Sequence, residues 1–401
     1  MPWHAQLIQE QQRRREKNLW RTRHEINSLQ STRVRRIVGG ESQEYLNFSS
    51  NDYLGLASDP RLAEASAKAA NVWGTGSGAS HLVSGHQTPH HLLEQELADF
   101  VGAESALLFS TGYMANLAIP AAFLGRGDLL LQDKLNHASL IDSSMLCRAN
   151  LKRYPHADYD RALSALTESS ANRKLLSTDA VFSMDGDMAD LRKLSDICDT
   201  TNTLLVADDA HGFGVLGKHN ASRGSLDKQG LKPTGNILMM GTLGKALGSF
   251  GAFIAGDEVF IEQLKQTART YIYTTALPAT VVAATRVALQ IIKDEYWRRS
   301  HLTELIHYFR TSAASLGLTL MDSQSAIQPL IIGEDAEALK VSEKLEQNRI
   351  WVPAIRPPTV PVGTARLRIC LSSAHSTDDI DQLIDALTHQ ADQITRDQKH
   401  A

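Results

Sequence analysis

Apolar and polar residues alternate in blocks along this chain. From residue 103 onward, short apolar runs bounded by turn residues are interleaved with segments in which apolar residues recur every three or four positions. This alternation of strand and helix patterns is typical of a mostly parallel β-sheet with helices on both faces. The strands expected from it lie at 106–109, 128–132, 152–154, 180–184, 203–207, 237–240 and 250–255.

The N-terminal part of the chain is basic. Residues 6–36 are rich in arginine and helix-prone, and we expect a solvated helix that packs on the body of the protein. An RNA-binding arm is the weaker alternative, because no aromatic stacking platform accompanies the charges. A short strand is expected at 45–48, which gives an N-terminal helical arm and short strand over residues 1–55.

The rest of the chain divides into two further parts. A large α/β domain is expected over 56–290. A long helical stretch at 278–316 should lead from it into a smaller C-terminal α/β domain over 291–401. In that smaller domain we expect strands at 328–332, 351–355 and 366–371 and helices at 336–347 and 377–392.

The composition is that of an ordinary globular protein. The 401 residues are 42% hydrophobic, and a formal net charge of -4 gives no general attraction to nucleic acid or to anionic membranes. Three widely spaced cysteines fit neither a disulfide framework nor a zinc pattern, which favours a reducing compartment. Neither a secretory signal nor a membrane-spanning stretch is recognisable. We therefore expect a soluble cytoplasmic protein that binds neither nucleic acid nor membrane.

Chemically useful side chains follow the expected strands at their carboxyl ends. Lys245 comes just after the apolar run 237–240 and the turn residues 241–244, where burial would make its amine nucleophilic. Ligands of parallel sheets bind beyond the carboxyl ends of the strands. The residues expected to converge there are Gly112, Ser183, Asp208, His211, Thr242 and Lys245.

These groups are the ones that pyridoxal phosphate requires. A lysine forms a Schiff base with its aldehyde, and an aspartate such as Asp208 keeps the pyridine nitrogen protonated, so that the ring becomes an electron sink. Backbone N–H groups of Gly112 and Tyr113 at a helix N-terminus suit the phosphate, and Thr242 adds a hydroxyl donor. His211 is placed to reach the ring hydroxyl. Each residue alone has a structural explanation, and their convergence favours the cofactor.

The sequence gives weaker support to three other kinds of site: a dinucleotide site, a phosphate-binding loop and a metal site. The glycine pattern at 74–79 follows a helix rather than a strand, which argues against a dinucleotide site. The segment 241–246 lacks the spacing and the hydroxyl of a phosphate-binding GxxxxGK[ST] loop. Four histidines have no carboxylate at ligand spacing, so we expect no metal and leave their role open: His81, His86, His90 and His91.

Several motifs together resemble the α-oxoamine synthases, a family of fold-type I pyridoxal-phosphate-dependent transferases with the aspartate aminotransferase-like fold. The segment AIRPPTVP at 354–361 resembles the biotin-pathway branch of that family. The resemblance covers nearly the whole chain and implies a homodimer with sites at the subunit interface. The motifs are NDYLG at 51–55, GH at 85–86, FSMDG at 182–186, DDAHG at 208–212 and TLGKALG at 242–248.

The resemblance implies a role for each matched residue. Lys245 would carry the cofactor and move protons at the substrate α-carbon, with Asp208 at the ring nitrogen and His137 stacked on the ring. Ring-hydroxyl contacts are implied for Ser183 and His211, phosphate contacts for Gly112, Tyr113 and Thr242, and contacts to the partner's phosphate for Thr274 or Thr275. Substrate contacts are implied for Arg21, Asn51, His137, Arg356 and Thr359, with Arg356 binding the amino-acid carboxylate.

The activity implied by the resemblance is a decarboxylating condensation in biotin biosynthesis. L-alanine would react with a pimeloyl thioester, carried on CoA or on a carrier protein, and CO2 and the free thiol would leave. Glycine acetyltransferase activity is the alternative within the family. A pyridoxal-phosphate transaminase is the alternative from another class.

Overall fold

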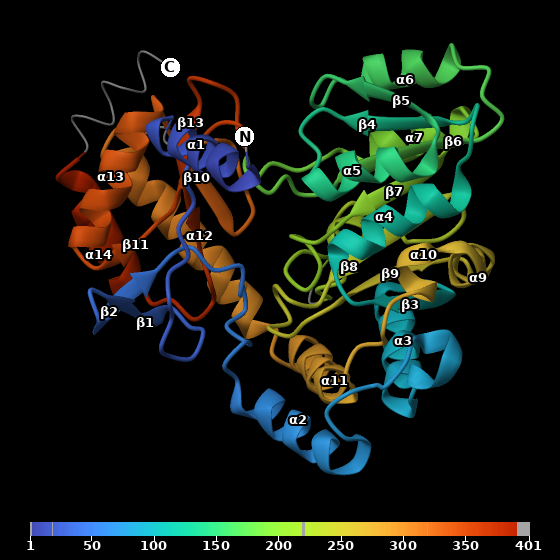
Figure 1. Ribbon diagram of the computed structural model, residues 1–401, viewed down its shortest axis with the longest axis horizontal. Coiled ribbons are helices and arrows are strands. Elements are labelled where there is room, and N and C mark those ends of the chain that lie inside the picture. Colours follow the sequence, from blue (N-terminus) through green and yellow to red (C-terminus); the bar gives the residue numbers. More distant parts are fainter. Residues whose placement is uncertain (1, 18, 219–220, 319, 391–401) are drawn as a thin grey trace.

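A seven-stranded sheet forms the centre of the larger of two bodies in the computed structural model (Figure 1). The structure describes residues 2–17, 19–218, 221–318 and 320–390. The strand order is β3-β9-β8-β7-β6-β4-β5, and only β9 runs antiparallel to its neighbours, which confirms the expected mostly parallel sheet. The strands are β3 (Ser105–Phe109), β4 (Leu129–Asp133), β5 (Asn150–Tyr154), β6 (Lys174–Asp179), β7 (Leu204–Asp208), β8 (Ile237–Thr242) and β9 (Ala252–Gly256).

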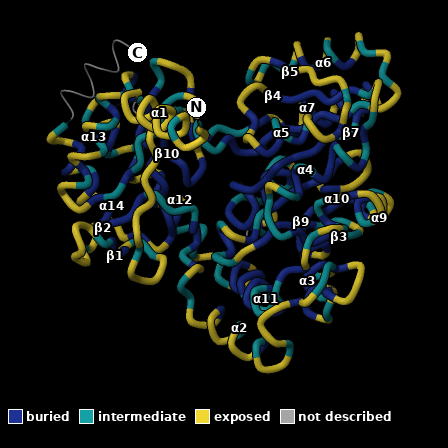
Figure 2. The backbone as a smooth tube through the Cα atoms, in the orientation of Figure 1, coloured by how far each residue is buried: buried dark blue, intermediate teal, exposed yellow. Residues whose placement is uncertain are grey.

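Helices cover both faces of this sheet because its strands are apolar on both sides. Leu205 and Ala207 of β7 belong to one buried cluster, and Val206 between them belongs to a second one on the opposite face. Figure 2 shows the buried chain running through the central strands. The helices of this body are α3 (Thr88–Val101), α4 (Gly112–Phe123), α5 (Ala138–Cys147), α6 (Tyr159–Thr167), α7 (Leu191–Thr200), α8 (Ser225–Lys228), α9 (Glu258–Thr267) and α10 (Arg269–Ile272).

The smaller body joins the two ends of the chain. One three-stranded sheet is formed by β10 (Ile327–Gly333), β13 (Ala365–Cys370) and β12 (Ala354–Ile355). In a second one, β1 (Arg33–Val38) and β2 (Glu41–Asn47) pair with β11 (Ile350–Trp351), so residues far apart in sequence lie side by side (Figure 1). The remaining elements are α1 (Trp3–Glu16), α2 (Pro60–Trp73), the π-helix His81–Gly85, α11 (Ala279–Asp294), α12 (Trp297–Ser315), α13 (Asp335–Gln347) and α14 (Thr377–Thr388).

None of the described helices combines the length and the hydropathy that crossing a membrane requires. The boundaries expected at residues 55 and 290 stay a prediction. The expected long helix at 278–316 is two helices, α11 and α12, with a break near residue 295. The expected final helix ends at Thr388, and its last two positions, 391–392, lie outside the described residues.

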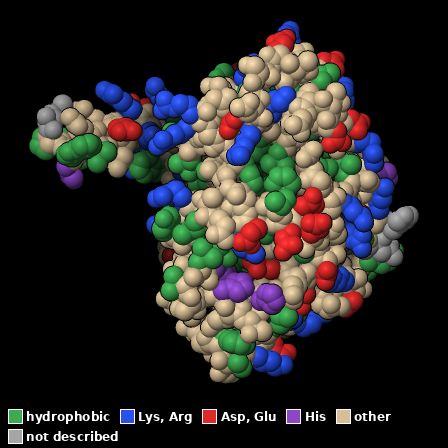
Figure 3. Space-filling model, turned by 90° about the vertical axis from the view of Figure 1, so that its right-hand side faces the viewer, with side chains coloured by type: hydrophobic (Ala, Val, Ile, Leu, Met, Phe, Trp, Pro, Cys, Tyr) green, Lys and Arg blue, Asp and Glu red, His purple; other side chains and the backbone are tan. Residues whose placement is uncertain are grey.

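The expected helix over 6–36 was wrong beyond Glu16. Residues 33–38 form β1, whose alternate side chains Val34 and Arg36 point inward. Arg36 is an acceptable inward residue because its guanidinium pairs with Glu346 at 2.8 Å and lies over Trp351. The expected packing of the arm on the body was also wrong, because α1 has no buried residue. Figure 3 shows the resulting projection, which carries Lys and Arg side chains.

The strand expected at 180–184 was displaced. Strand β6 ends at Asp179, and the chain then turns back, with Gly186 N–H donating to Phe182 O at 2.8 Å. Val181 and Phe182 are apolar and buried, so they look like strand residues although they lie in the turn beyond the sheet. Ser183 therefore projects from a turn rather than from the end of a strand.

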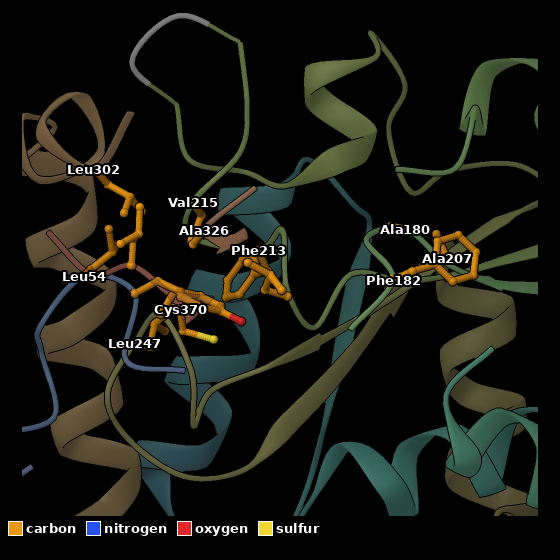
Figure 4. Packing of buried hydrophobic residues seen from close by; sticks show 14 of the residues in the cluster. Leu54, Ala180, Phe182, Ala207, Phe213, Val215, Leu247, Leu302, Ala326 and Cys370 are labelled. Carbon is orange, nitrogen blue, oxygen red and sulfur yellow. The ribbon is translucent and has the colours of Figure 1, made fainter. Parts of the chain in front are cut away.

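The segment after β8 is locked against the N-terminal part of the chain. Leu247 lies in the same buried cluster as Leu54 and Cys370 (Figure 4). Gly248 has a φ of +60°, and a Cβ at this position would come within 2.2 Å of Ala57 N. This close backbone approach holds Lys245, three residues earlier, in a fixed place.

A Gly248→Ala substitution should lower the melting temperature and the free energy of unfolding by more than about 2 kcal/mol, because the methyl group has no space. Gly235→Ala is the matched control, since its φ is +63° and its Cβ would meet nothing within 4 Å. That variant should lose only about 1 kcal/mol, from backbone strain alone. Thermal denaturation of both variants measures the difference, and equal losses would refute the packing argument.

Candidate active site

The carboxyl ends of five strands bring the candidate residues to one edge of the large sheet. Gly112 opens α4 after β3, and His137 is the N-cap residue of α5 after β4. Ser183 lies in the turn after β6. The residues that follow the two central strands are Asp208 and His211 after β7 and Thr242 and Lys245 after β8.

Lys245 is half-buried, and its Nζ lies 3.0 Å from His211 Nε2. Burial lowers the pKa of its amine to about 8, although Asp208 and Asp179 pull the pKa upward. The same burial, together with the charges of Lys245 and Arg368, lowers the pKa of His211 well below its usual value. Lys245 is therefore a strong candidate nucleophile and base, and His211 is a neutral imidazole.

Asp208 is a buried carboxylate that accepts hydrogen bonds but forms no ion pair among the described residues. Its side chain accepts hydrogen bonds from Asn116 Nδ2 at 2.7 Å and from Ala210 N at 3.0 Å, and the residue is 3% exposed. No ion pair among the described residues includes Asp208. Because burying a charge without a partner is costly, this site favours a cationic ligand group such as a protonated pyridine nitrogen.

The N-terminus of α4 lies close to the segment that carries Lys245. A Cβ on Gly112 would come within 2.8 Å of Thr242 Cγ2, so only glycine allows this approach. The first N–H groups of a helix have no partner within the helix and favour anions. Ser110 Oγ donates to Thr275 O at 3.5 Å, which places the 274–275 segment beside this turn. The Tyr113 side chain is exposed and donates to Asp142.

His137 is held by its neighbours with its ring exposed. Its Nδ1 lies 2.7 Å from Ser139 Oγ, and its backbone N–H donates to Asp179 Oδ2 at 2.6 Å. Asp179 itself is buried, and burial together with the charge of Asp208 raises its pKa well above the usual value. The amine, the buried carboxylate, the glycine-opened helix and this exposed ring together fit pyridoxal phosphate.

Arg368 of β13 is a candidate that the sequence analysis missed. The residue is 6% exposed, and its guanidinium donates to Ser183 O at 2.6 Å and to Asn51 Oδ1 at 3.2 Å. Among the described residues it forms no ion pair with a carboxylate. The signal in the sequence was a pair of arginines, Arg366 and Arg368, inside a strand whose other residues are apolar. This buried cation near Lys245 is suited to an anionic group of a substrate.

Three of the expected substrate residues line a separate cavity. Arg21, Arg356 and Thr359 border a space of about 610 Å³, together with Trp20 and Arg14 at the end of α1. Asn51 lies instead in the hydrogen-bonded network of Arg368 and Tyr53. The expected substrate residues thus occupy two places.

His156 is a second residue that the sequence analysis missed. Its ring bridges Asp133 Oδ1 at 3.1 Å and Asp187 Oδ2 at 2.9 Å. Asp133 ends β4, four residues before His137, and Asp187 follows the turn that contains Ser183. The two carboxylates raise the pKa of His156 to about 10 against the opposing effect of burial. His156 therefore ties two loops of the site together as a cation.

Two of the four clustered histidines, His81 and His86, are neutral. His81 Nδ1 and His86 Nδ1 lie 2.9 Å apart, and burial lowers the pKa of His81 to about 3 and that of His86 to about 4. Over the described part of the chain, no group of three or more His, Cys, Asp or Glu side chains is arranged to hold a metal ion. Their role is not defined by these contacts.

The fold and the groups at this sheet edge define a fold-type I pyridoxal-phosphate-dependent transferase. Residues 43–387 match the family model described as aminotransferase class I and II. Two relatives called 8-amino-7-oxononanoate synthase are similar along nearly their whole length. The one from Saccharophagus degradans is 51% identical over 96% of both chains, and the one from Alcanivorax borkumensis is 52% identical over 88% of this chain and 90% of the relative.

Solved structures agree with the sequence comparison. A serine palmitoyltransferase from S. paucimobilis with bound PLP superposes with a TM-score of 0.89 at 26% identity, covering 97% of both chains. The 8-amino-7-oxononanoate synthase from Francisella tularensis has a TM-score of 0.75 at 32% identity, covering 87% of this chain and 98% of that one. The chain belongs to the aminotransferase class I and II family and, within it, to the family of 8-amino-7-oxononanoate synthases.

The pKa of His156 predicts how its contribution to stability depends on pH. Because the folded-state pKa is raised from 6.5 to about 10, the stabilisation is complete below pH 6.5 and is lost as the pH rises towards 10. His156→Gln should therefore lower the free energy of unfolding by about 1–3 kcal/mol at pH 6 and by much less above pH 10. Melting temperatures of both proteins across this range test it, and a difference independent of pH would show that His156 is not charged.

Proposed function

We propose that the chain condenses L-alanine with a pimeloyl thioester to form 8-amino-7-oxononanoate, with release of CO2 and the free thiol, in biotin biosynthesis. The observation that carries the proposal is the similarity to 8-amino-7-oxononanoate synthases, at 51% identity over 96% of the chain. The geometry agrees with it, because a lysine amine of lowered pKa lies near a buried carboxylate that needs a cation.

Different residues would bind different parts of the cofactor. Bound pyridoxal phosphate stabilises the negative charge that develops at the α-carbon of the amino acid. Asp208 would keep the ring nitrogen protonated, which would also compensate its own buried charge, and His137 would pack against the ring face. Ser183 and His211 would contact the ring hydroxyl. Gly112, Tyr113 and Thr242 would hold the phosphate, joined by Thr274 or Thr275 of the partner subunit.

Lys245 holds the cofactor and, when its amine is free, moves the proton at the α-carbon. A pKa of about 8 leaves a large fraction of the amine neutral in weakly basic solution, so it can accept the proton. The ammonium formed in this way returns a proton after CO2 has left. Lys245 thus accepts one proton and gives one back in each catalytic cycle.

Arg368 is the better-placed anchor for the carboxylate of L-alanine. It lies close enough to Lys245 to lower the pKa of the amine, and it shares Asn51 Oδ1 with Tyr53. The sequence analysis assigned this role to Arg356, which lines the cavity of about 610 Å³ with Arg21 and Thr359. That cavity has apolar walls from Leu19, Trp20 and two prolines, which suits the methylene chain and distal carboxylate of the pimeloyl group.

We also infer a cytoplasmic homodimer. Helix α1 has no buried residue and exposes Trp3, Leu7 and Ile8, whose apolar surface a second subunit would cover. The three cysteines are buried and free, as in a reducing compartment. Light scattering of the purified protein tests the assembly, and a monomer at micromolar concentration would exclude it.

The reaction itself is tested by mixing the loaded protein with L-alanine and pimeloyl-CoA and measuring free thiol. Thiol release should require both substrates. Turnover of glycine with acetyl-CoA instead, or amino transfer to a 2-oxo acid without any thioester, would replace the proposal by one of the alternative activities.

Lys245→Ala should lose at least about a thousandfold in rate and should no longer fix the cofactor covalently when borohydride is added. Lys232→Ala, at an exposed position in the same part of the chain, is the control and should behave as the unmodified protein. Covalent fixation that survives in Lys245→Ala would mean that another lysine carries the cofactor.

Separate lysine substitutions distinguish the two arginines. Arg368→Lys should raise the KM for L-alanine by about tenfold or more, because a lysine cannot bind a carboxylate in the bidentate manner. Arg356→Lys should instead raise the KM for pimeloyl-CoA. Steady-state kinetics with each substrate varied in turn measure both KM values. If Arg356→Lys raised the KM for L-alanine and Arg368→Lys raised the KM for pimeloyl-CoA, the assignment of Arg356 to the amino acid would be correct.

A further inference from the structure

A continuous line of hydrogen bonds leads from Asn51 through Tyr53 and His211 to Lys245. Tyr53 Oη lies 3.1 Å from Asn51 Oδ1 and 2.6 Å from His211 Nδ1. The other ring nitrogen, His211 Nε2, is 3.0 Å from Lys245 Nζ. Tyr53 is 1% exposed and His211 is 7% exposed, so protein groups must satisfy their polar atoms. The proposed reaction leaves Tyr53 without a role.

Burial keeps the two central residues of this line, Tyr53 and His211, uncharged. It raises the pKa of Tyr53, so the phenol keeps its proton. It also lowers the pKa of His211, so the imidazole is neutral and has a single N–H group. The nitrogen that carries this hydrogen decides whether Nε2 accepts a hydrogen bond from Lys245 or donates one to it.

Two arrangements satisfy the whole line, and they correspond to the two charge states of Lys245. When Lys245 is an ammonium, it donates to His211 Nε2, His211 Nδ1–H donates to Tyr53 Oη, and Tyr53 donates to Asn51 Oδ1. When Lys245 is a neutral amine, His211 Nε2–H donates to it, and Tyr53 donates to His211 Nδ1. Asn51 Oδ1 then still accepts from Arg368 at 3.2 Å. The Tyr53 hydroxyl can follow the change of tautomer at His211 because it can both donate and accept a hydrogen bond, which a phenylalanine ring cannot do.

We propose that Tyr53 is a positioning residue that sets which nitrogen of His211 carries the hydrogen and thereby matches His211 to the charge of Lys245. The inference rests on the assignment of Lys245 in the proposed function. Without the hydroxyl, Nδ1–H would be a buried donor without an acceptor, whereas an Nδ1 lone pair is tolerated more easily. The hydrogen then stays on Nε2, where it opposes the ammonium form of Lys245.

The other charged groups around this line come from several elements and are left unchanged by the substitution Tyr53→Phe. Lys245 faces Asp208 of β7, Asp179 of β6 and Arg368 of β13. His211 also faces His137 at the start of α5, and Tyr53 faces Arg368 and Cys370. A change in the titration of Lys245 in Tyr53→Phe therefore reports the loss of the hydroxyl.

The test compares the pH dependence of acylation of Lys245 by acetic anhydride in the cofactor-free protein, read by mass spectrometry of the lysine peptide. In the unmodified protein the midpoint should lie at about pH 8. In Tyr53→Phe it should fall by about half a unit to one unit. The control is Tyr154→Phe, which alters another buried tyrosine, at the end of β5, and should leave the midpoint unchanged. An unchanged or raised midpoint in Tyr53→Phe would overturn the proposal.

A second measurement needs no folded variant of Tyr53. In protein labelled with ¹⁵N-histidine, the ring resonances of His211, identified by their loss in His211→Gln, should show the hydrogen moving from Nδ1 to Nε2 as the pH rises through about 8. A single tautomer throughout would refute the inference. Neither experiment uses the thioester, so a shifted midpoint without thiol release would reject only the proposed reaction.

Discussion

Two buried charges of opposite sign, neither of them in an ion pair among the described residues, set the conditions for the rest of this molecule. Asp208 and Arg368 are 3% and 6% exposed, and no ion pair among the described residues includes either of them. Such burial is costly, and the apolar clusters on both faces of the large sheet must offset it. In the proposed function, Asp208 would face the protonated ring nitrogen and Arg368 would face the carboxylate of the amino acid, so the folded chain would be complementary in charge to its ligands.

Asp208 belongs to the larger body of the structure and Arg368 to the smaller one, and the residues proposed for the cofactor and for the substrates are divided in the same way. The residues proposed for the cofactor follow strands of the large sheet, whereas Arg368, Arg356 and Thr359 come from the C-terminal part of the smaller body. Contacts between the bodies are made by backbone as well as by side chains, as in the bond from Arg368 Nε to Ser183 O at 2.6 Å. In the proposed function, the orientation of the amino acid relative to the cofactor would therefore depend on how the two bodies pack against each other.

The sequence allowed the large sheet and its site edge to be predicted because both depend on local patterns. Apolar runs followed by glycine and polar residues locate Asp208 and Lys245 without knowledge of the strand order. Arg368, Tyr53 and His156 could not be found in this way. Their importance comes from partners 185, 158 and 23 positions away, which only the packing of the strands and loops brings together. Ser183 shows an intermediate case, since its place was recognised although the end of its strand was misjudged.

The pairing of the two chain ends has a consequence for the order in which the site is assembled during synthesis. Strand β2 pairs with β1 on one side and with β11 on the other, and Cys370 N–H donates to Phe48 O at 2.8 Å. The segment of Asn51 and Tyr53 is therefore anchored in part by residues made near the end of translation. The strands of the large sheet are complete long before that. If the proposed roles hold, the lysine and aspartate proposed for the cofactor are synthesised early, whereas the residues proposed to bind the amino acid come together only in the finished polypeptide.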